Sequence, residues 1–513
     1  MVNTSFILDM QPKLYRWSAS DKDKTFSDLF NLICDRRTLF EAWTRLARNR
    51  GSQTPGTDGM TRRRLEEQAG GVDRFLNEVR HELRSGTYRP EPVRQRLIPK
   101  TGRPGQFRPL GIPTLKDRLV QMAMKFVLEP IFEADFYPNS YGFRRGRSTH
   151  DALAAVQRQL HPTNHGPSLT HYVIEGDIKG CFDAIDHHLL MEEVKRRIRD
   201  RKVLLLIRAF LKAGVMIEGS LEHSATGTPQ GGVLSPLLAN IFLHRLDERY
   251  DRWMPRPREK PTNAVSRRRL DRRNGRPTFY MVRYADDFLL LVVGSQRQAE
   301  AEREALAQFL WEEMRLELST EKTLITRPED GFTFLGYRVV RTKSRRSGNW
   351  VGNLRIPKDK VKALRREIKM RTSRATLVLP FKDLISALNP LISGWRNYFQ
   401  YATYASKEFQ ALDNWLWHRI DRWLRKKHRK TGARKLRARF RAGPHPPMRN
   451  RWRDGRAVSK RFLDGGTRRY RNRGVRIPNG WNDKELGDDP ALRGAPLFWR
   501  AYHALETMQS TGG

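Results

Sequence analysis

Two adjacent aspartates, Asp286 and Asp287, stand between two apolar segments of the sequence. The segments 279–282 and 288–293 are rich in β-branched and aromatic residues, which predicts a β-hairpin with both acids at its tip. A third acid, Asp177, closes another segment that we expect to be a strand. If these strands lie in one sheet, the carboxylates could hold two divalent ions about 3.5–4 Å apart, an arrangement that supports nucleotidyl transfer. Magnesium prefers such oxygen ligands.

Adjacent aspartates in a turn also have a simpler explanation, because they often cap backbone N–H groups or face solvent. An acidic pair between two apolar strands is nevertheless costly inside a protein unless cations compensate its charge. The pair alone therefore leaves both interpretations open, and its apolar surroundings favour bound metal ions.

The charge of the chain is strongly unbalanced. Its 513 residues include 98 Lys and Arg but 56 Asp and Glu, a formal net charge of +42. Such an excess predicts a polyanionic partner. Nucleic acid fits better than acidic lipid, because no apolar run is long enough to span a bilayer and no amphipathic helix accompanies a lipidation motif. The length predicts several domains, and 38% hydrophobic residues suffice for packed cores.

The sequence also indicates a cellular compartment. Cys34 and Cys181 are the two cysteines, which fits a reducing environment and excludes a four-cysteine zinc site. The N-terminal residues lack a basic start, an apolar stretch and a small-residue cleavage site, so we expect no secretory signal. We therefore expect a protein that stays inside the cell without a membrane partner.

The rest of the chain predicts the elements that would position these acids. Apolar spacing and capping signals predict helices at 35–50, from Ser148, at 189–211, from Ser235 and at 296–314. Strands are expected within the basic segment 88–113 and at 172–177 and 332–337. Residues 256–276 lack an apolar period and predict a mobile loop. A helical region with breaks at Pro380 and Pro390 is expected over 358–425, and a linker at 443–447.

The segment Tyr284-Ala-Asp-Asp287 resembles the active-site box of reverse transcriptases. The surrounding blocks are similar, in content and order, to those of bacterial group II intron-encoded reverse transcriptase/maturases. These blocks are Thr54-Pro-Gly-Thr-Asp-Gly59, Arg108-Pro-Leu-Gly-Ile-Pro113, Ser140-Tyr-Gly-Phe-Arg144, Asp177-Ile-Lys-Gly-Cys-Phe-Asp183, Gly227-Thr-Pro-Gln-Gly-Gly-Val-Leu-Ser-Pro236, Leu318-Ser-Thr-Glu-Lys-Thr323 and Phe334-Leu-Gly-Tyr337. They extend over about residues 12–400, which is far more specific than one short box.

The resemblance implies an α+β chain with the right-hand polymerase fold, in which fingers and palm contain antiparallel sheet and precede an α-helical thumb/maturase domain. We expect an N-terminal extension with fingers at 1–170, a palm at 171–350, the thumb/maturase domain at 351–442 and a basic nucleic-acid-binding region at 443–513. Asp177 and Asp286 are expected to bind two Mg²⁺ ions, with the backbone carbonyl of Ile178 assisting and Asp287 close by.

Five further residues match positions that bind the incoming deoxynucleotide in this family. Lys100 and Arg108 match cations of the fingers that hold the triphosphate, and Lys322 matches a motif lysine near it. Phe182 matches a bulky residue that would collide with a ribose 2′-hydroxyl, and Gln230 matches a residue against the nascent base pair. The simpler alternatives are solvated charge for the cations and core packing for Phe182.

The segment 388–399 resembles the maturase, or thumb, signature of the family. Its aromatic residues recur at helical spacing, so we expect them in the core. Exposed cations nearby are expected to contact the phosphates of structured RNA: Arg396, Arg422, Arg425, Lys426 and Lys427.

The C-terminal segment 467–481 interleaves arginine with aromatic residues. It could stack bases while neutralising phosphate, or it could be a solvated tail. Relatives in this family often carry an HNH endonuclease here, with cysteine pairs and histidines. We see no such cluster and do not expect this chain to cleave a target strand.

The resemblance implies an RNA-directed DNA polymerase that binds its group II intron RNA, promotes splicing and copies the intron into new DNA sites by target-primed reverse transcription. The expected partners are intron RNA, RNA template, DNA primer, target DNA and deoxynucleotides. The expected location is the bacterial cytoplasm, and the nucleoid during action on DNA. Two alternatives stay open: a polymerase-inactive splicing cofactor, and a host-recruited reverse transcriptase in defence or repair.

Overall fold

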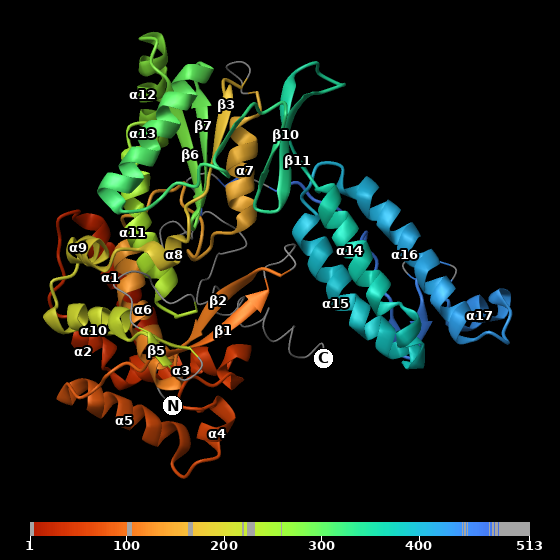
Figure 1. Ribbon diagram of the computed structural model, residues 1–513, viewed down its shortest axis with the longest axis horizontal. Coiled ribbons are helices and arrows are strands. Elements are labelled where there is room, and N and C mark those ends of the chain that lie inside the picture. Colours follow the sequence, from red (N-terminus) through yellow and green to blue (C-terminus); the bar gives the residue numbers. More distant parts are fainter. Residues whose placement is uncertain are drawn as a thin grey trace. The chain divides into compact units, whose positions relative to one another are not determined.

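The computed structural model describes residues 5–99, 105–162, 168–217, 220–222, 231–257, 259–443, 445, 448, 450–470, 472, 473, 477 and 481 (Figure 1). The chain folds into two compact units. The first comprises Met1–Ala152, Thr170–Ile325 and Arg473–Gly513, and the second comprises Leu153–Leu169 and Thr326–Asn472. Helices and antiparallel strands occur in both units, which confirms the α+β class expected from the sequence.

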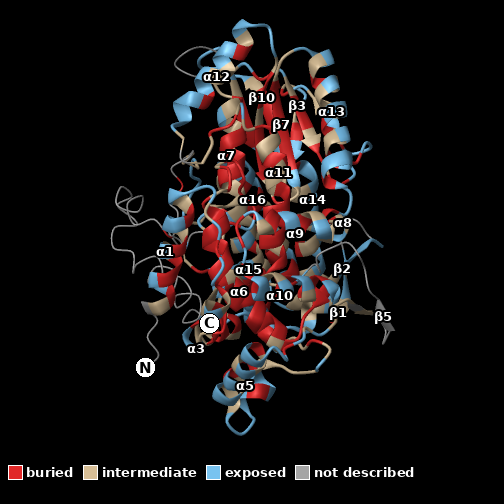
Figure 2. Cartoon of the chain, turned by 90° about the vertical axis from the view of Figure 1, so that its left-hand side faces the viewer, coloured by how far each residue is buried: buried red, intermediate tan, exposed pale blue. Residues whose placement is uncertain are grey.

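A four-stranded sheet in the first unit carries the three candidate acids. Its strand order is β6 (Thr278–Tyr284), β7 (Asp287–Val293), β3 (Tyr172–Gly176) and β8 (Leu324–Thr326). The β6–β7 and β7–β3 pairs are antiparallel, which confirms the predicted hairpin. Figure 2 shows β3 and β7 as largely buried strands, which agrees with their mainly apolar sequences.

A second four-stranded sheet in this unit confirms the basic strands expected within residues 88–113. Its order is β2 (Phe107–Ile112), β1 (Val93–Pro99), β4 (Val215–Ile217) and β5 (Ser220–Glu222). Strands β1 and β2 form an antiparallel hairpin, whereas β1 and β4 are parallel. Because side chains alternate along strands, the register places Arg94, Arg96 and Arg108 on one face of the hairpin.

Helix α6 (Leu115–Glu133) lies in the core of the first unit, where almost all its side chains are buried. Thr114 caps it by accepting a hydrogen bond from the Asp117 N–H at 3.1 Å. Helices α1 (Ser5–Ser20) and α3 (Arg36–Ala47) pack against it. Further helices of this unit are α2 (Phe30–Ile33), η1 (Arg50–Gln53), α4 (Arg62–Glu66), α5 (Gly71–Ser85), α8 (Cys181–Ala184), α9 (His187–Lys195), α10 (Arg201–Lys212), α11 (Ser235–Arg249), α12 (Pro261–Arg273) and α13 (Gln296–Met314). Helix α7 (Thr149–Gln159) begins in the first unit and continues in the second.

The second unit joins a three-stranded antiparallel sheet to a group of helices. The strand order is β11 (Trp350–Arg355), β10 (Tyr337–Lys343) and β9 (Phe332–Phe334). The helical segments are α14 (Lys358–Arg371), η2 (Arg374–Val378), α15 (Phe381–Phe399), α16 (Ala405–Lys427) and α17 (Ala433–Phe440). The Tyr398 hydroxyl donates to the Leu335 carbonyl, so α15 is bound to the sheet. Two short strands, β12 (Arg453–Asp454) and β13 (Ala457–Val458), pack against α15.

Residues 261–273 form helix α12, which corrects the mobile loop expected at 256–276. This helix is anchored by polar bonds rather than by an apolar stripe. The buried carboxylate of Asp271 accepts hydrogen bonds from Arg252 at 2.6 and 2.9 Å and from the indole N–H of Trp253 at 3.0 Å. The absent apolar period therefore gave the wrong prediction, because periodicity detects apolar anchoring alone.

Two helix predictions also need correction. The single helix expected at 189–211 is divided into α9 and α10, because Asp200 accepts from the backbone N–H groups of residues 202 and 203 and so starts a new helix. Pro390 lies inside α15 and does not end it, whereas the break at Pro380 is confirmed. In the described part of the chain, none of the helices is both long and apolar enough to cross a bilayer.

The strand expected at 332–337 is a tight hairpin of two strands instead. Leu335 and Gly336 both have positive φ, 46° and 74°, and reverse the chain between β9 and β10. A left-handed leucine is uncommon, so Gly336 is the main local signal for this reversal.

The compact units differ from the expected domain boundaries. Strands β9 and β10, which we placed in the palm, group with β11 and the helices of the second unit. Residues 450–470 also pack against these helices. The ring centroids of Trp452 and Trp417 lie 5.1 Å apart in a stacked pair, and those of Phe462 and Trp395 lie 5.6 Å apart. Residues 450–470 of the expected C-terminal region therefore fold onto these helices.

Candidate active site

Strand pairing brings the three candidate acids to one edge of the first sheet. Gly176 of β3 pairs with Phe288 of β7, so the next residue, Asp177, lies across from Asp287 at the start of β7. Asp286 precedes it in the two-residue turn of the β6–β7 hairpin. Glycine is required at position 176, because an added Cβ would overlap the Phe288 ring.

The backbone after Asp177 directs one carbonyl toward the same edge. Ile178 forms an antiparallel bridge with Leu318, flanked by backbone hydrogen bonds of 2.8 and 2.9 Å. In a bridge of this kind, the two opposed residues point their own N–H and C=O groups away from each other. The Ile178 carbonyl therefore points to the β7 side of β3, where the predicted assisting ligand would have to lie.

Burial and neighbouring carboxylates raise the pKa of Asp286 and of Asp287. Burial raises the pKa of Asp286, and Asp177 adds to the rise. Burial of its carboxyl group, followed by Asp286 and Asp177, raises the pKa of Asp287 to about 6, although the residue as a whole is exposed. Converging like charges favour a bound cation, which is the electrostatic condition for a metal site.

Lys322 brings positive charge to this edge. Its Nζ donates to Asp177 Oδ2 at 2.7 Å, with both side chains partly exposed. Lys322 also opposes the rise in the pKa of Asp287. The structure thus places this predicted triphosphate ligand directly beside the acids.

The chemistry of these donors fits a divalent cation. Carboxylates from Asp177 and Asp286, with Asp287 and the Ile178 carbonyl beside them, are the oxygen ligands that hard cations take. Among the described residues, no three acidic, histidine or cysteine side chains converge tightly enough to form a complete metal site. One of the proposed ligands, Asp177, is instead paired with Lys322.

Phe182 lies at the edge of the core, in α8, five residues after Asp177. Its half-buried ring makes a T-shaped contact with Phe143 at 6.2 Å. Phe143 is 49% exposed and has φ 58°, which is unusual for a residue other than glycine. Phe182 is therefore only partly in the core, and its ring contacts a second aromatic ring. Phe143 is a further candidate for nucleotide contact that was not predicted from the sequence.

The other nucleotide-binding candidates are only partly placed. Arg108 is exposed on β2, on the face that it shares with Arg94 and Arg96. Lys100 and Gln230 lie outside the described residues. The roles of all three stay predictions.

The predicted RNA-binding cations of α16 have unequal surroundings. Arg422 and Lys426 are exposed. Arg425 pairs with Asp421 at 2.9 Å, and Lys427 donates to a carbonyl of η2 at 2.6 Å. Arg422 and Lys426 are therefore better placed for phosphate than Lys427, whose ammonium already stabilises the fold.

Arg396 is half buried, which corrects its expected exposure. Its guanidinium donates to the side chain of Asn397 at 2.8 Å and to the carbonyl of Gly466 at 3.4 Å. An added Cβ at Gly465 would come within 2.5 Å of the same guanidinium. Arg396 therefore helps to hold the turn at 465–466 against α15.

Two residues of the arginine-rich segment 467–481 serve the fold. Trp481 is 2% exposed, and its indole N–H donates to Gln11 Oε1 at 3.2 Å. Arg473 pairs with the buried carboxylate of Asp151 at 2.7 Å. Base stacking by Trp481 is thus excluded in this structure, because its ring is enclosed.

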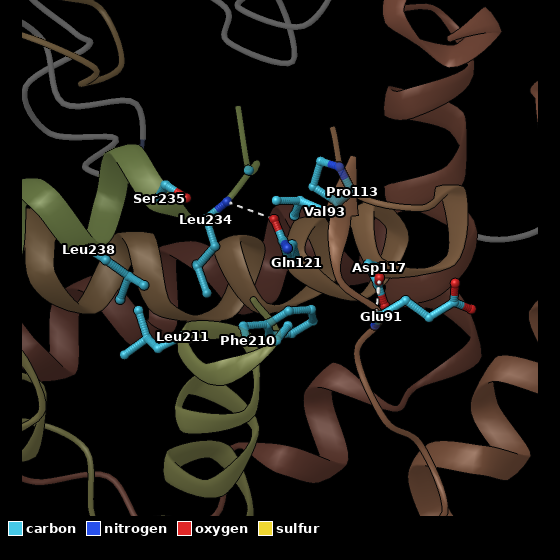
Figure 3. Close-up of a pocket in the computed structure, with 12 residues that line it drawn as sticks. Glu91, Val93, Pro113, Asp117, Gln121, Phe210, Leu211, Leu234, Ser235 and Leu238 are labelled. Atoms are coloured by element: carbon cyan, nitrogen blue, oxygen red, sulfur yellow. Dashed lines mark hydrogen bonds between the residues drawn. The ribbon is translucent and has the colours of Figure 1, made fainter. Parts of the chain in front are cut away.

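A small cavity lies beside the segment that leads into α11 (Figure 3). Gln121 of α6 accepts there from the backbone N–H groups of Val233 at 2.8 Å and Leu234 at 3.4 Å. Nearby Asp117 accepts from the Tyr88 hydroxyl at 2.5 Å, and burial raises the pKa of Asp117 to about 6. The cavity of about 20 Å³ has room for one water molecule and none for a nucleotide. Its polar groups fix the entry to α11.

Sequence reasoning also missed a buried arginine behind the β6–β7 turn. Arg283 pairs with Asp247 of α11 at 2.5 Å and donates to the Ala285 carbonyl at 3.0 Å. The available signal was an arginine within an apolar strand, together with Asn240 and Asp247 on the apolar face of α11. A single charged residue within an apolar segment therefore indicates a buried ion pair when another apolar segment contains a residue of opposite charge.

Two family descriptions match the sequence. Residues 98–339 match the reverse transcriptase (RNA-dependent DNA polymerase) family, and residues 361–441 match the group II intron, maturase-specific domain. The first match includes the three candidate acids, and the second includes α15, α16 and α17.

Relatives include protein YkfC of Escherichia coli (strain K12), 41% identical over 354 residues that cover 66% of this chain and 90% of that protein. Group II intron-encoded protein LtrA of Lactococcus lactis subsp. cremoris is 35% identical over 371 residues, 64% of this chain and 59% of LtrA. Nuclear intron maturase 2, mitochondrial, of Arabidopsis thaliana is 26% identical over 44% of this chain and 38% of that protein. The chain thus spans most of YkfC but little more than half of LtrA. It belongs to the family of group II intron-encoded reverse transcriptases, in which a metal-dependent reverse transcriptase domain with the right-hand polymerase fold precedes a helical maturase-specific domain.

Proposed function

We propose that this chain is an RNA-directed DNA polymerase that also binds its group II intron RNA, promotes its splicing and copies the intron into new sites by target-primed reverse transcription. Its substrates would be an RNA template, a DNA primer, target DNA and deoxynucleotides. The observation that carries the proposal is the convergence of Asp177, Asp286 and Asp287 at one sheet edge, in a chain that matches both family descriptions.

Two Mg²⁺ ions are the proposed cofactor. Asp177 and Asp286 would hold them, with the Ile178 carbonyl assisting and Asp287 beside them. When bound, such ions activate a primer 3′-hydroxyl and neutralise the leaving pyrophosphate. The raised pKa values of Asp286 and Asp287 support this assignment, because a bound cation would offset both the burial and the repulsion that raise them.

The protein's own groups would orient the nucleotide. Lys322, Arg108 and Lys100 would hold the triphosphate, a role that suits cationic side chains. Of the two described residues, Lys322 bonds Asp177 and Arg108 is exposed on β2. Phe182 would exclude a ribose 2′-hydroxyl, and Gln230 would lie against the nascent base pair. Phe143 is 49% exposed and contacts the half-buried ring of Phe182, which supports contact between this pair and a sugar ring.

Intron RNA would bind mainly through cations of the second unit. We propose Arg422 and Lys426 as direct phosphate contacts. Arg425, Lys427 and Arg396 would contribute less, because Arg425 pairs with Asp421 and the other two bond a distant segment of the chain. The Arg422 Nε donates at 3.3 Å to a carbonyl of its own helix, which leaves both Nη atoms for phosphate. The match to the maturase-specific domain supports this assignment. We also propose that residues 1–170 form the fingers and residues 171–350 the palm. The proposed location is the bacterial cytoplasm, and the nucleoid during DNA integration.

Primer extension by the purified chain tests the polymerase activity. We expect DNA synthesis that requires an RNA template, deoxynucleotides and Mg²⁺, and that stops when a chelator is added. Intron splicing in the presence and absence of the protein tests the maturase activity on RNA transcribed from the gene's flanks. Splicing assistance without any synthesis would contradict the polymerase and favour a polymerase-inactive splicing cofactor.

A further inference from the structure

The turn that presents Asp286 has an unfavourable backbone conformation. Ala285 has φ 57°, a region that favours glycine, and it occupies the first position of the two-residue β6–β7 turn. Strain of this kind persists where the surrounding structure enforces it. The side chains around the turn identify what enforces it here.

Arg283 binds the turn from within the core. Its Nη1 donates to the Ala285 carbonyl at 3.0 Å and to Asn240 Oδ1 at 3.1 Å. Its Nε and Nη2 donate to the carboxylate of Asp247 at 3.0 and 2.5 Å. The side chains of Arg283 and Asp247 are both 0% exposed. One guanidinium therefore connects the strained turn to two residues of α11.

A third segment closes the arrangement on the other side of the turn. Asn240 Nδ2 donates to the Gly142 carbonyl at 2.8 Å. The backbone of Gly142 lies so close to Ala285 that an added Cβ would overlap the Ala285 nitrogen. The backbone of Arg283 bonds with that of Asn139 and Tyr141 at 3.0 and 2.8 Å. The segment 139–142 is thus fixed against the turn by Asn240 and by the backbone of Arg283.

Stability alone is a poor reason for this arrangement. A fully buried ion pair can often be replaced by apolar residues of similar volume without loss of stability. A guanidinium, by contrast, donates several hydrogen bonds in fixed directions, here to a carboxylate, an amide and a carbonyl at once. The chemistry of the cluster therefore suits the positioning of a backbone segment.

We infer that Arg283, held by Asp247 and Asn240, is a positioning residue that fixes the Ala285 turn and thereby the carboxylate of Asp286. The inference rests on the proposed polymerase function for its kinetic consequence, but not for its effect on the turn itself.

Two variants of the full-length chain separate positioning from stability. Arg283→Lys keeps the charge but cannot bond Asp247, Asn240 and Ala285 together. The double variant Arg283→Met/Asp247→Leu removes both buried charges and leaves neither unpaired. Arg197→Lys is the matched control, since Arg197 is also buried and donates to backbone carbonyls at the end of α1.

Three measurements are needed for each variant: thermal unfolding, single-nucleotide incorporation, and Mn²⁺ binding by electron paramagnetic resonance. The Mn²⁺ sample contains a dideoxy-terminated primer on an RNA template with the next deoxynucleotide, so that no reaction occurs. We expect both Arg283 variants to fold, to lose about 100-fold in kcat with KM for the nucleotide changed less than about threefold, and to bind Mn²⁺ more weakly. The Arg197→Lys chain should match the wild type in kcat and Mn²⁺ binding.

The outcomes distinguish this inference from the proposed function. Folded Arg283 variants with kcat and Mn²⁺ binding within about threefold of the wild type would overturn the inference. Unfolding of both variants would also overturn it, because the cluster would then serve stability. A wild-type chain that binds Mn²⁺ but performs no synthesis would contradict the polymerase, and Mn²⁺ binding by the variants would still decide the inference.

Discussion

Lys322 and Asp177 form a hydrogen-bonded ion pair, with Nζ and Oδ2 2.7 Å apart, at the sheet edge where the three acids converge. The lysine thus places a single positive charge beside the proposed metal ligands, which would be neutralised more fully by divalent ions. We expect the pair to separate when a divalent ion binds Asp177, which would leave Lys322 free for the triphosphate.

Replacing Lys322 by Met should separate metal binding from nucleotide binding. Mn²⁺ should bind the free chain more tightly, because a competing cation is removed from Asp177, while kcat/KM for the nucleotide should fall about tenfold or more. Lys179→Met is the control in the same region, since Lys179 pairs with the exposed Glu317. Equal effects in both variants, measured by Mn²⁺ titration and nucleotide incorporation, would contradict a specific role for Lys322.

Substitution of Phe182 should relax selection against ribonucleotides. We expect Phe182→Ala to raise the ratio of kcat/KM for a ribonucleotide to that for its deoxynucleotide by about tenfold or more, because space opens for the 2′-hydroxyl. Phe143→Ala should give a smaller change in the same direction, since its ring supports Phe182 at 6.2 Å. Single-nucleotide incorporation measures both ratios, and unchanged selectivity in Phe182→Ala would refute the assignment.

Asp117 should make folding stability depend on pH. Burial raises the pKa of Asp117 from 3.8 to about 6 in the folded chain, so the folded state binds this proton more tightly than the unfolded state. Its stabilising contribution is complete at low pH and is lost as the pH rises through about 6, by at most about 3 kcal/mol.

Asp117→Asn cannot ionise and should avoid this loss. Its free energy of unfolding relative to the wild type should therefore increase between about pH 4 and 7, as measured by urea unfolding at several pH values. A relative stability that is constant or falls over this range would show that the buried carboxyl does not titrate as described.

Cations of α16 should contribute unequally to RNA affinity. Lys426→Ala should weaken intron RNA binding and reduce the slope of log affinity against log salt by about one, because an exposed ammonium releases counterions when it neutralises phosphate. Lys427→Ala should mainly lower stability, since Lys427 donates to η2 at 2.6 Å. Filter binding across a salt series and thermal unfolding distinguish the two effects. A larger loss of RNA affinity in Lys427→Ala than in Lys426→Ala would contradict the assignment of Lys426 as the phosphate contact.

The β6–β7 hairpin, which carries the candidate acids, could be predicted because its signals are local. Apolar segments on both sides of Asp286 and Asp287 predict the hairpin, and a mainly apolar segment likewise marks β3 before Asp177. The predicted start of α11 at Ser235 rests likewise on a capping residue followed by proline. Such features depend on neighbours within a few residues, so a single sequence contains them.

Other parts of the structure depend on partners distant in the sequence. Asp271 anchors α12 through Trp253, 18 residues away, and Arg283 meets Asp247 across 36 residues. Trp481 is buried against Gln11, 470 residues away. No local period encodes these bonds, which is why a loop was predicted for α12 and an exposed aromatic for Trp481.

The most direct test of the proposed activity is primer extension by Asp286→Ala on an RNA template, with intron RNA binding measured in parallel. Asp286 lies at the turn and should affect metal-dependent chemistry alone, because the proposed RNA contacts belong to the second unit. We predict that the variant loses DNA synthesis and keeps intron RNA affinity within about threefold of the wild type. Undiminished synthesis by Asp286→Ala would contradict the assignment of this hairpin as the polymerase active site.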